Sequence, residues 1–379
     1  MHSLYKVMAS YPPPGYQFLV GQTRWDGVSS AVAKVNPIYA FQERILSRLI
    51  PVNIVKASIE RFKKPPQGTD LTYSTGHLVF RDEPWVIDLE FVTQLAGFSL
   101  TYFHRYKKLI EKVLSSEYCQ KIICWTEAGK RTVLENMNCQ GFEHKVEVVY
   151  LPVPTKNFTK DYTNSGKVKL LFVGSANIAG EFIIDGGVEV LEAFSQLNNR
   201  YDNLELVIRS DLPRSVKVKY GKTNNIRIID EIIPWEQLEN EFKSADIFLF
   251  PAHTTPGLVI LDAMSYELPV ITTDVWANPE MVENGKTGFV IKKPERVQYY
   301  VENFIPNWDY IPESRFMRAI KNFDPKVIDE LVAKASLLIE NEELRRQMGK
   351  QGRKEIETGK FSLKKRNEKL GKIFDEATA

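Results

Sequence analysis

Cysteine is scarce in this sequence, neither sign of charge is in excess, and no long apolar run occurs. Three cysteines (Cys119, Cys124 and Cys139) leave an odd count without the spacing of a zinc site, so we expect reduced thiols and no metal. The 50 basic and 48 acidic residues give a net charge of +2, which does not support a surface for nucleic acid. No stretch approaches the roughly 20 apolar residues of a membrane span, and the N-terminus does not resemble a signal peptide. We therefore expect a cytoplasmic protein.

The length and the hydrophobic content are those of a globular protein with two domains. A chain of 379 residues exceeds one ordinary core. Its 43% hydrophobic and 11% aromatic residues allow ample burial, and short apolar runs alternate with amphipathic stretches as in parallel α/β sheets. The polar stretch 152–166 is the best linker candidate. We predict Rossmann-like domains over 1–158 and 159–360, and a final helix over 361–379.

Hydrophobic periodicity predicts the individual elements. Short apolar runs are interpreted as strands, and stretches with apolar residues three or four apart as helices. In the first half we predict strands at 5–10, 52–58, 84–90, 121–126 and 145–151, short extended runs at 71–74 and 77–80, and helices at 38–49, 100–115 and 127–137. In the second half we predict strands at 169–173, 204–209, 226–229, 247–250 and 268–272, and helices at 188–197, 235–244, 326–340 and 342–358.

The stretch 245–291 carries most of the information about function. Residues 247–250 form an apolar run, a small polar loop follows, and apolar residues then recur at helical spacing from Leu258 before the next apolar run. Strand, tight loop, helix and strand make one βαβ unit of a parallel sheet, in which ligands bind at the carboxyl ends of strands. Backbone amides near Gly257 and Leu258 could hold an anionic group. The carboxylate of Asp262, farther along this helix, could accept hydrogen bonds from sugar hydroxyls.

The same stretch carries a longer pattern of residues. Its members are Gly257, Leu258, Leu261, Ala263, Met264, Leu268, Pro269, Val270, Ile271, Pro279, Glu280, Gly285, Thr287, Gly288 and Phe289. On these residues the chain resembles family 4 glycosyltransferases, which are retaining enzymes of the GT-B fold. The resemblance implies two Rossmann-like domains with parallel sheets facing a central cleft, and a C-terminal helix that returns to the N-terminal domain. The family has two glutamates eight positions apart, where this chain has Thr254 and Asp262.

The resemblance also implies roles for individual donor-site residues. Asp262 takes the position that holds the nucleotide ribose, although a solvated or helix-stabilising carboxylate is the alternative. Thr254 takes the position of the family's sugar-contacting glutamate and is therefore a candidate catalytic residue. Its hydroxyl can form a hydrogen bond with a sugar but carries no charge. Glu280 either contacts the donor or braces its loop. His253 is better explained as a local loop histidine than as a ligand.

A cation for the donor diphosphate is missing from its usual place. The family has a lysine in the turn that follows a Phe-Val-Gly strand end, and this chain keeps Gly174 but has Asp185 instead of the lysine. Asp185 is interpreted as a helix N-cap, since a carboxylate would repel a diphosphate. Arg209, at the end of the strand 204–209, is the alternative phosphate ligand, unless it is a surface residue or pairs with Asp211. Two loop lysines, Lys217 and Lys219, are weaker candidates. Gly174 lies close to the ligand or forms a simple turn.

In the first domain the carboxylates of Asp88 and Glu90 lie at the end of a predicted strand. They point to the same side of that strand, where the resembled family commonly has a histidine that faces the sugar. They could act as a catalytic base or clamp a hydroxyl, or they could cap the following helix. The proline-rich segment 11–15 takes the place of a glycine-rich acceptor loop.

The resulting expectation is a hexosyltransferase-type glycosyltransferase (EC 2.4). Its donor would be a nucleotide-diphosphate sugar, its acceptor a glycan, a lipid-linked molecule or a small molecule, and it would need no cofactor. Peripheral membrane contact stays open. The alternative is a non-catalytic GT-B protein that binds a partner, because the family's glutamates and lysine are substituted. A GT-B enzyme of another class, such as a sugar-nucleotide epimerase, is the third hypothesis.

Overall fold

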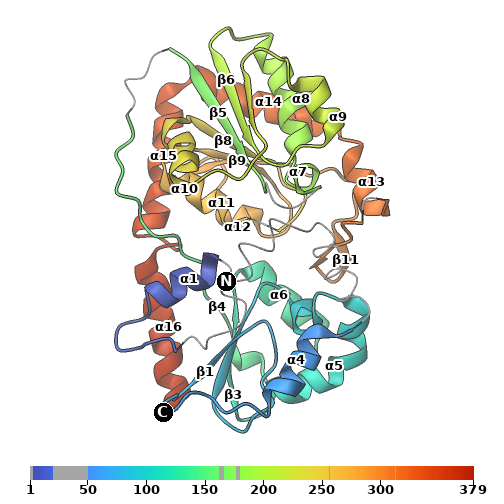
Figure 1. Cartoon of the computed structure of the whole chain (residues 1–379), viewed down its shortest axis with the longest axis vertical. Helices are drawn as coiled ribbons and strands as arrows, with labels where there is room; N and C mark the ends of the chain where they lie inside the picture. The colour runs from blue at the N-terminus through green and yellow to red at the C-terminus, as the bar shows by residue number, and fades with distance from the viewer. Residues whose placement is uncertain (1–2, 20–49, 162–165, 176–179, 256, 312) are drawn as a thin grey trace. The chain divides into compact units, whose positions relative to one another are not determined.

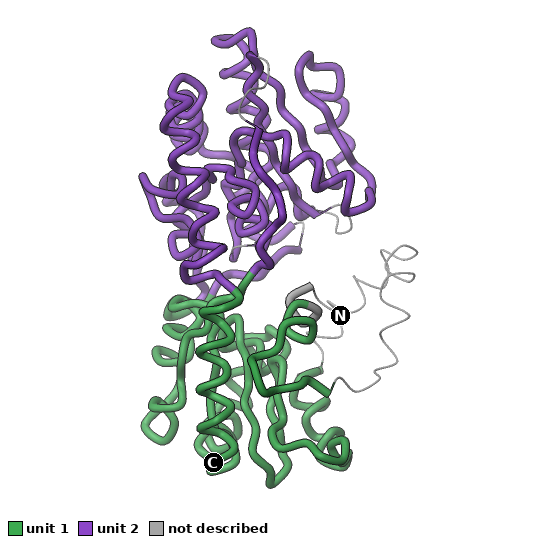
Figure 2. Tube along the Cα trace, turned by 90° about the vertical axis from the view of Figure 1, so that its left-hand side faces the viewer, with its two compact units in different colours: residues 1–152, 302–305, 363–379 green, residues 153–301, 306–362 purple. Residues whose placement is uncertain are grey.

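The computed structural model describes residues 3–19, 50–161, 166–175, 180–255, 257–311 and 313–379 (Figure 1). Contacts divide the chain into two compact units, coloured separately in Figure 2. Unit 1 comprises residues 1–152, 302–305 and 363–379, and unit 2 comprises residues 153–301 and 306–362. In the described part of the chain, no helix is both long and apolar enough to cross a membrane.

Unit 1 is built on a sheet of four parallel strands in the order β1-β2-β3-β4. All five residues of β2 are buried, as expected for a strand covered on both faces. The strands are β1 Thr72–Thr75, β2 Trp85–Leu89, β3 Cys119–Cys124 and β4 Val146–Val148. The helices are α1 Ser3–Ser10, α4 Val52–Glu60, η1 Val92–Ala96, α5 Leu100–Leu114, α6 Glu127–Asn136, η2 Glu143–Lys145 and α16 Leu363–Thr378.

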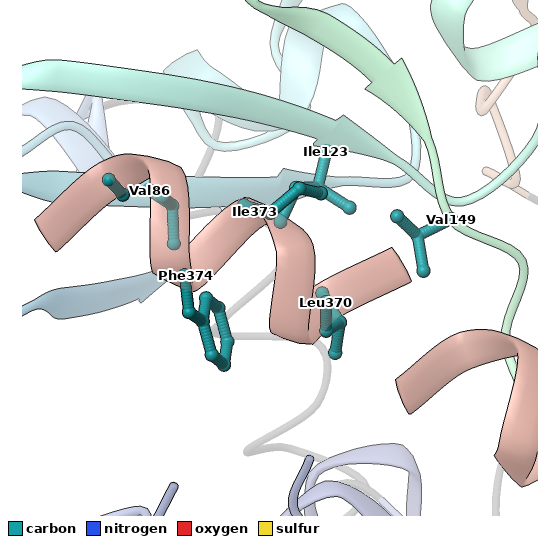
Figure 3. Packing of buried hydrophobic residues seen from close by; sticks show 7 residues of the cluster. Val86, Ile123, Val149, Leu370, Ile373 and Phe374 are labelled. Atoms are coloured by element: carbon teal, nitrogen blue, oxygen red, sulfur yellow. The ribbon is translucent and has the colours of Figure 1, made fainter. Parts of the chain in front are cut away.

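The C-terminal helix α16 completes the core of unit 1, as predicted. Its buried residues Leu370, Ile373, Phe374 and Ala377 pack on the sheet residues Val86 and Ile123 and on Val149 (Figure 3). Their spacing of three and four residues places them on one face of the helix. The lysines of α16 are exposed: Lys364, Lys365 and Lys369 precede Leu370, and Lys372 lies between Leu370 and Ile373.

A conservative truncation should measure this packing. We expect Ile373→Val to lower the free energy of unfolding of unit 1 by about 1 kcal/mol, because a buried methyl group is lost and the space closes only in part. Ile373 is 1% exposed, whereas Ile59, also in unit 1, is 58% exposed. Ile59→Val is therefore the matched control, and urea unfolding is the measurement. Equal effects of the two substitutions would contradict a tightly packed α16.

Unit 2 is built on six parallel strands in the order β10-β9-β8-β5-β6-β7. The chain runs outward from β5 through β6 to β7 and then returns to β8 on the other side of β5. A sheet of this kind binds ligands where the chain reverses, at the carboxyl ends of the two central strands. The strands are β5 Val168–Val173, β6 Leu204–Arg209, β7 Ile226–Ile229, β8 Ile247–Phe250, β9 Val270–Thr273 and β10 Gly288–Ile291.

Helices follow most strands of unit 2. They are α7 Glu181–Ile184, α8 Gly187–Asn198, α9 Arg214–Tyr220, α10 Trp235–Ser244, α11 Val259–Ser265, α12 Asn278–Met281, α13 Arg315–Lys321, α14 Pro325–Glu340 and α15 Glu342–Glu357. Helix α14 packs against α8, and α15 packs against α11. The short strands β11 Tyr300–Glu302 and β12 Ile305–Pro306 form a separate two-stranded sheet.

Two predicted strands near the N-terminus are wrong. Residues 5–10 lie in α1, and residues 52–58 lie in α4. The β-branched residues of the second segment suggested a strand, but its buried residues Ile54 and Ala57 are three apart, on one face of a helix. The run 77–80 is not a strand, and the predicted helix 38–49 lies outside the described residues.

Candidate functional site

The loops after β5 and β8 meet at the reversal point of the unit 2 sheet. Gly174 follows β5 directly and is fixed between neighbours: its N–H donates to the carbonyl of Arg209 over 2.9 Å, and its carbonyl accepts from Arg209 Nη1 over 3.0 Å. A Cβ atom at this position would lie 2.8 Å from Ser210 Oγ and 2.9 Å from Asp185 Oδ2. A side chain at position 174 would therefore force Ser210 or Asp185 to move.

Asp185 is not a helix N-cap, so that prediction is wrong. The residue that precedes α8 is Gly186, which has φ 83° and makes no side-chain cap. The Asp185 carboxyl instead accepts a hydrogen bond from the backbone N–H of Ser175. Burial, and then the charge of Glu181, raise the pKa of Asp185 well above its ordinary value.

Arg209 keeps its charge without an acidic partner. Its guanidinium bonds the Gly174 carbonyl, its Nε has no hydrogen-bond partner, and burial lowers its pKa. Within the described residues it forms no ion pair, so pairing with Asp211 is wrong. By contrast, Lys217 pairs with Asp230 over 2.5 Å and Lys219 pairs with Glu192 over 2.7 Å. Arg209 is therefore the candidate with unused donors beside Gly174.

A buried triad links the loop after β8 to the start of α8. His253 Nε2 lies 2.9 Å from Glu189 Oε1, and His253 Nδ1 lies 2.7 Å from the hydroxyl of Tyr299. The backbone N–H of His253 also donates to the carbonyl of Ile184 over 2.7 Å. A Cβ on Gly186 would lie 2.3 Å from the Pro251 carbonyl, so the two loops are in direct contact. Both side chains of the His253–Glu189 pair are 1% exposed. His253 is therefore a buried residue that stabilises the core, and not a local loop histidine.

Thr254 and the start of α11 follow His253. The Thr254 hydroxyl shares a hydrogen bond with the hydroxyl of Tyr310. Helix α11 begins at Val259 with Leu258 as its cap, and no side chain caps it. The amides of Gly257 and Leu258 donate to no described residue, which leaves them available to an anion.

Asp262 lies in the first turn of α11. Its Oδ1 is 3.9 Å from Lys156 Nζ, too far for a hydrogen bond. Burial raises the pKa of Asp262 to about 6, against the opposing charge of Lys156. Glu280 lies in α12, after β9, where its carbonyl accepts from Lys360.

The carboxylates predicted in unit 1 do not share one environment. Asp88 is 1% exposed, and its Oδ2 accepts from the Tyr73 hydroxyl over 3.2 Å. It lines a cavity of about 10 Å³, which is roughly the space of one water. Glu90 lies past the end of β2 and is not part of that wall. Neither carboxylate is the N-cap residue of the following helix η1, because that residue is Phe91.

The proline-rich segment is attached to α16. The carbonyl of Tyr11 accepts from Arg366 over 3.0 Å, and the carbonyl of Pro12 accepts from Asn367 over 3.2 Å. Arg366 is buried, which lowers its pKa to about 10. The segment is therefore part of the packing of unit 1.

Within the described ranges, no group of three or more His, Cys, Asp or Glu side chains could hold a metal ion. The three cysteines are buried and free. Burial raises the pKa of Cys139 to about 11.

Known proteins contain segments similar to the one that forms this arrangement. Residues 167–305, which include the whole reversal point, match the family model "Glycosyl transferases group 1". Over these residues the chain is similar to the group 1 glycosyl transferases. The capsular polysaccharide biosynthesis glycosyltransferase CapM of Staphylococcus aureus is 26% identical over 191 residues, which are 48% of this chain and 41% of CapM. The chain thus spans less than half the length of this curated relative.

Solved structures confirm the GT-B fold predicted from the sequence. The sucrose-phosphate synthase of Thermosynechococcus elongatus matches with a TM-score of 0.59 at 13% identity, over 87% of this chain and 78% of that one. HepE of Anabaena, solved in complex with UDP and glucose, matches with a TM-score of 0.53 at 14% identity, over 77% of this chain and 72% of that one. At such identities the similarity establishes the fold alone.

Proposed function

We propose that this chain is a glycosyltransferase that takes a sugar from a nucleotide-diphosphate sugar and transfers it, with retention, to an acceptor hydroxyl. The supporting observation is the position of Arg209 at the reversal point of the sheet, where its guanidinium has unused hydrogen-bond donors beside Gly174. The amides of Gly257 and Leu258, which donate to no described residue, belong to the loop after the neighbouring strand β8. HepE, which has the same fold, was solved with UDP and glucose.

In this proposal the residues act mainly by electrostatics. Negative charge develops on the leaving diphosphate, and Arg209 and the two amides would stabilise it there. The acceptor would approach on the leaving-group face, with a phosphate oxygen taking its proton, so no enzyme nucleophile is needed. Thr254 would hydrogen-bond the sugar, Asp262 the ribose, and Glu280 would brace the donor loop. No metal is required in this scheme.

A non-catalytic binding protein is the second candidate. It is favoured by Asp185 and Thr254, which stand where the resembled family has a lysine and a glutamate. Calorimetric titration of the full chain with UDP, followed by incubation with a panel of nucleotide sugars, separates the two. A transferase should bind UDP and slowly release it from one donor even without acceptor, whereas a silent binder should only bind. Absence of binding of any nucleoside diphosphate at millimolar concentration would refute the transferase and leave the non-catalytic protein.

The pKa of Asp262 predicts how UDP binding depends on pH. Its carboxylate accepts hydroxyl hydrogen bonds, and with a pKa of about 6 this form is lost as the pH falls. We expect the affinity for UDP to drop roughly tenfold between about pH 7.5 and pH 5. UDP itself titrates in this range, so Asp262→Asn is the control: its pH profile should lack the contribution of Asp262. Parallel profiles for the two proteins would contradict the role of Asp262.

The same pKa shift has a consequence for stability. The folded-state pKa of Asp262 lies above the unfolded value of 3.8, so the folded state binds the proton more tightly. Its contribution to stability is therefore present at low pH and is lost as the pH rises from about 4 to 6. Urea unfolding at several pH values should show this loss in the wild-type protein and not in Asp262→Asn. A larger loss of unfolding free energy in Asp262→Asn than in the wild-type protein would contradict the expected direction of this pH dependence.

A further inference from the structure

A lysine outside the matched segment 167–305 lies beside the proposed ribose carboxylate. Lys156 Nζ is 3.9 Å from Asp262 Oδ1 and 5.0 Å from the centre of the Trp235 ring. Trp235 is the first residue of α10 and is 47% exposed, although it is a large apolar side chain. All three residues belong to unit 2.

The position of Lys156 is fixed by the segment that carries it. Arg353 of α15 donates to the carbonyl of Lys156 over 3.2 Å and to the carbonyl of Phe158 over 2.6 Å. Farther along, the ammonium of Lys160 donates to the carbonyls of Lys243 and Ala245, at the C-terminal end of α10. This attachment keeps Lys156 beside α10 and α11, where its ammonium lies over the rings of Trp235 and Tyr266, 5.0 and 5.7 Å from their centres.

The two charged groups have unused hydrogen-bonding capacity. Lys156 donates to none of the residues that the structure describes, and the Asp262 carboxylate accepts from none. An ammonium carries three donors, and a carboxylate carries acceptors only. A donor and an acceptor that face each other just beyond bonding distance match a vicinal diol, because one hydroxyl can accept from the ammonium while its neighbour donates to the carboxylate.

The exposed ring of Trp235 adds a second kind of contact. A nucleoside joins a vicinal diol on its ribose to a flat aromatic base, and an indole face can stack on any base. The Lys156 ammonium lies 5.0 Å from the centre of the Trp235 ring and 3.9 Å from Asp262 Oδ1, so the ring and the carboxylate flank the same ammonium. Polar diol contacts and an aromatic face therefore occur together on one surface of unit 2.

We propose that Trp235 and Lys156 form, with Asp262, the nucleoside subsite of the donor. The base stacks on Trp235, and the ribose diol bridges Lys156 and Asp262. This inference rests on the proposed use of a nucleotide donor. It adds a statement of which ligands the donor site prefers. Because stacking tolerates any base, the subsite selects ribonucleotides over bare diphosphate more strongly than one base over another.

The test is calorimetric titration of the full chain with UDP, 2′-deoxy-UDP and inorganic pyrophosphate. Trp235→Ala should weaken UDP roughly 10- to 100-fold and leave pyrophosphate unchanged, whereas Trp235→Phe should restore most of the affinity. Lys156→Met should weaken UDP about tenfold and 2′-deoxy-UDP by less, because a hydroxyl of the diol is already missing. The matched controls are Phe62→Ala and Lys364→Met, whose aromatic ring and ammonium are both well exposed. Thermal unfolding checks that each variant is folded.

The outcomes separate this inference from the proposed function. If the wild-type chain binds UDP and the Trp235 and Lys156 variants bind it as well as the controls do, the subsite is refuted and the function stands. An equal loss of UDP and pyrophosphate in the variants also refutes the subsite, since only the diphosphate contacts would then be affected. If the wild-type chain binds neither UDP nor pyrophosphate, both the nucleoside subsite and the proposed transferase function are wrong.

Discussion

Replacing Arg209 by alanine should reduce turnover of the nucleotide-sugar donor by roughly 10²- to 10³-fold. Preorganised donors aimed at a charge that develops on the leaving group contribute rate effects of this size. Arg209 fits this role because it is half-buried, has an unpartnered Nε and forms no ion pair within the described residues. Hydrolysis of the donor without acceptor is the measurement, and the affinity for UDP should fall in parallel by roughly 10- to 100-fold.

The control for Arg209→Ala is Arg318→Ala, in the same unit. Arg318 lies on the exposed face of α13, and its removal should change neither turnover nor UDP affinity. Arg209→Lys should recover only part of the loss, because an ammonium replaces the planar guanidinium. Equal effects of the two alanine substitutions would refute the assignment of Arg209.

Replacing His253 by alanine should lower the free energy of unfolding by roughly 3 to 5 kcal/mol. The substitution leaves the Glu189 carboxylate buried without its partner, and such a group is costly. One oxygen of Glu189 already lacks a hydrogen bond, so the remaining one depends on His253. The loss of the imidazole also opens space beside Tyr299. Urea unfolding is the measurement.

The matched control for His253→Ala is His144→Ala, because His144 is exposed. It should change stability by less than about 0.5 kcal/mol. Tyr299→Phe, which removes one hydroxyl from the triad, should cost about 1 kcal/mol. A loss for His253→Ala no larger than the loss for His144→Ala would contradict a bracing role.

Strands and helices of unit 2 were predictable where a local pattern was unambiguous. The boundaries of β6, β7, α10 and β8 agree with the sequence-based ranges, because each run is apolar or periodic and is closed by turn residues. The short helices α1 and α4 were missed because a run of under ten residues fits either structure. For such short runs, the choice between helix and strand depends on which side chains are buried against the rest of the fold.

The site was predictable only in its local parts. Gly257 and Asp262 belong to one continuous motif, whereas the contacts of His253 join residues 64 and 46 positions away in the sequence. Lys156 reaches Asp262 from more than a hundred positions away. No spacing rule reveals such pairs, because the topology of the sheet brings them together. Asp185 was misread for the same reason: its neighbours after β5 and β6 are not local.

The division of unit 1 between the two ends of the chain affects how the protein is made. Unit 2 is almost continuous in sequence, so the ribosome releases nearly all of it before α16 emerges. Until then Val86, Ile123 and Val149 have no helix to cover them. The part of the molecule that is synthesised first therefore completes its core only when its last helix, α16, is available.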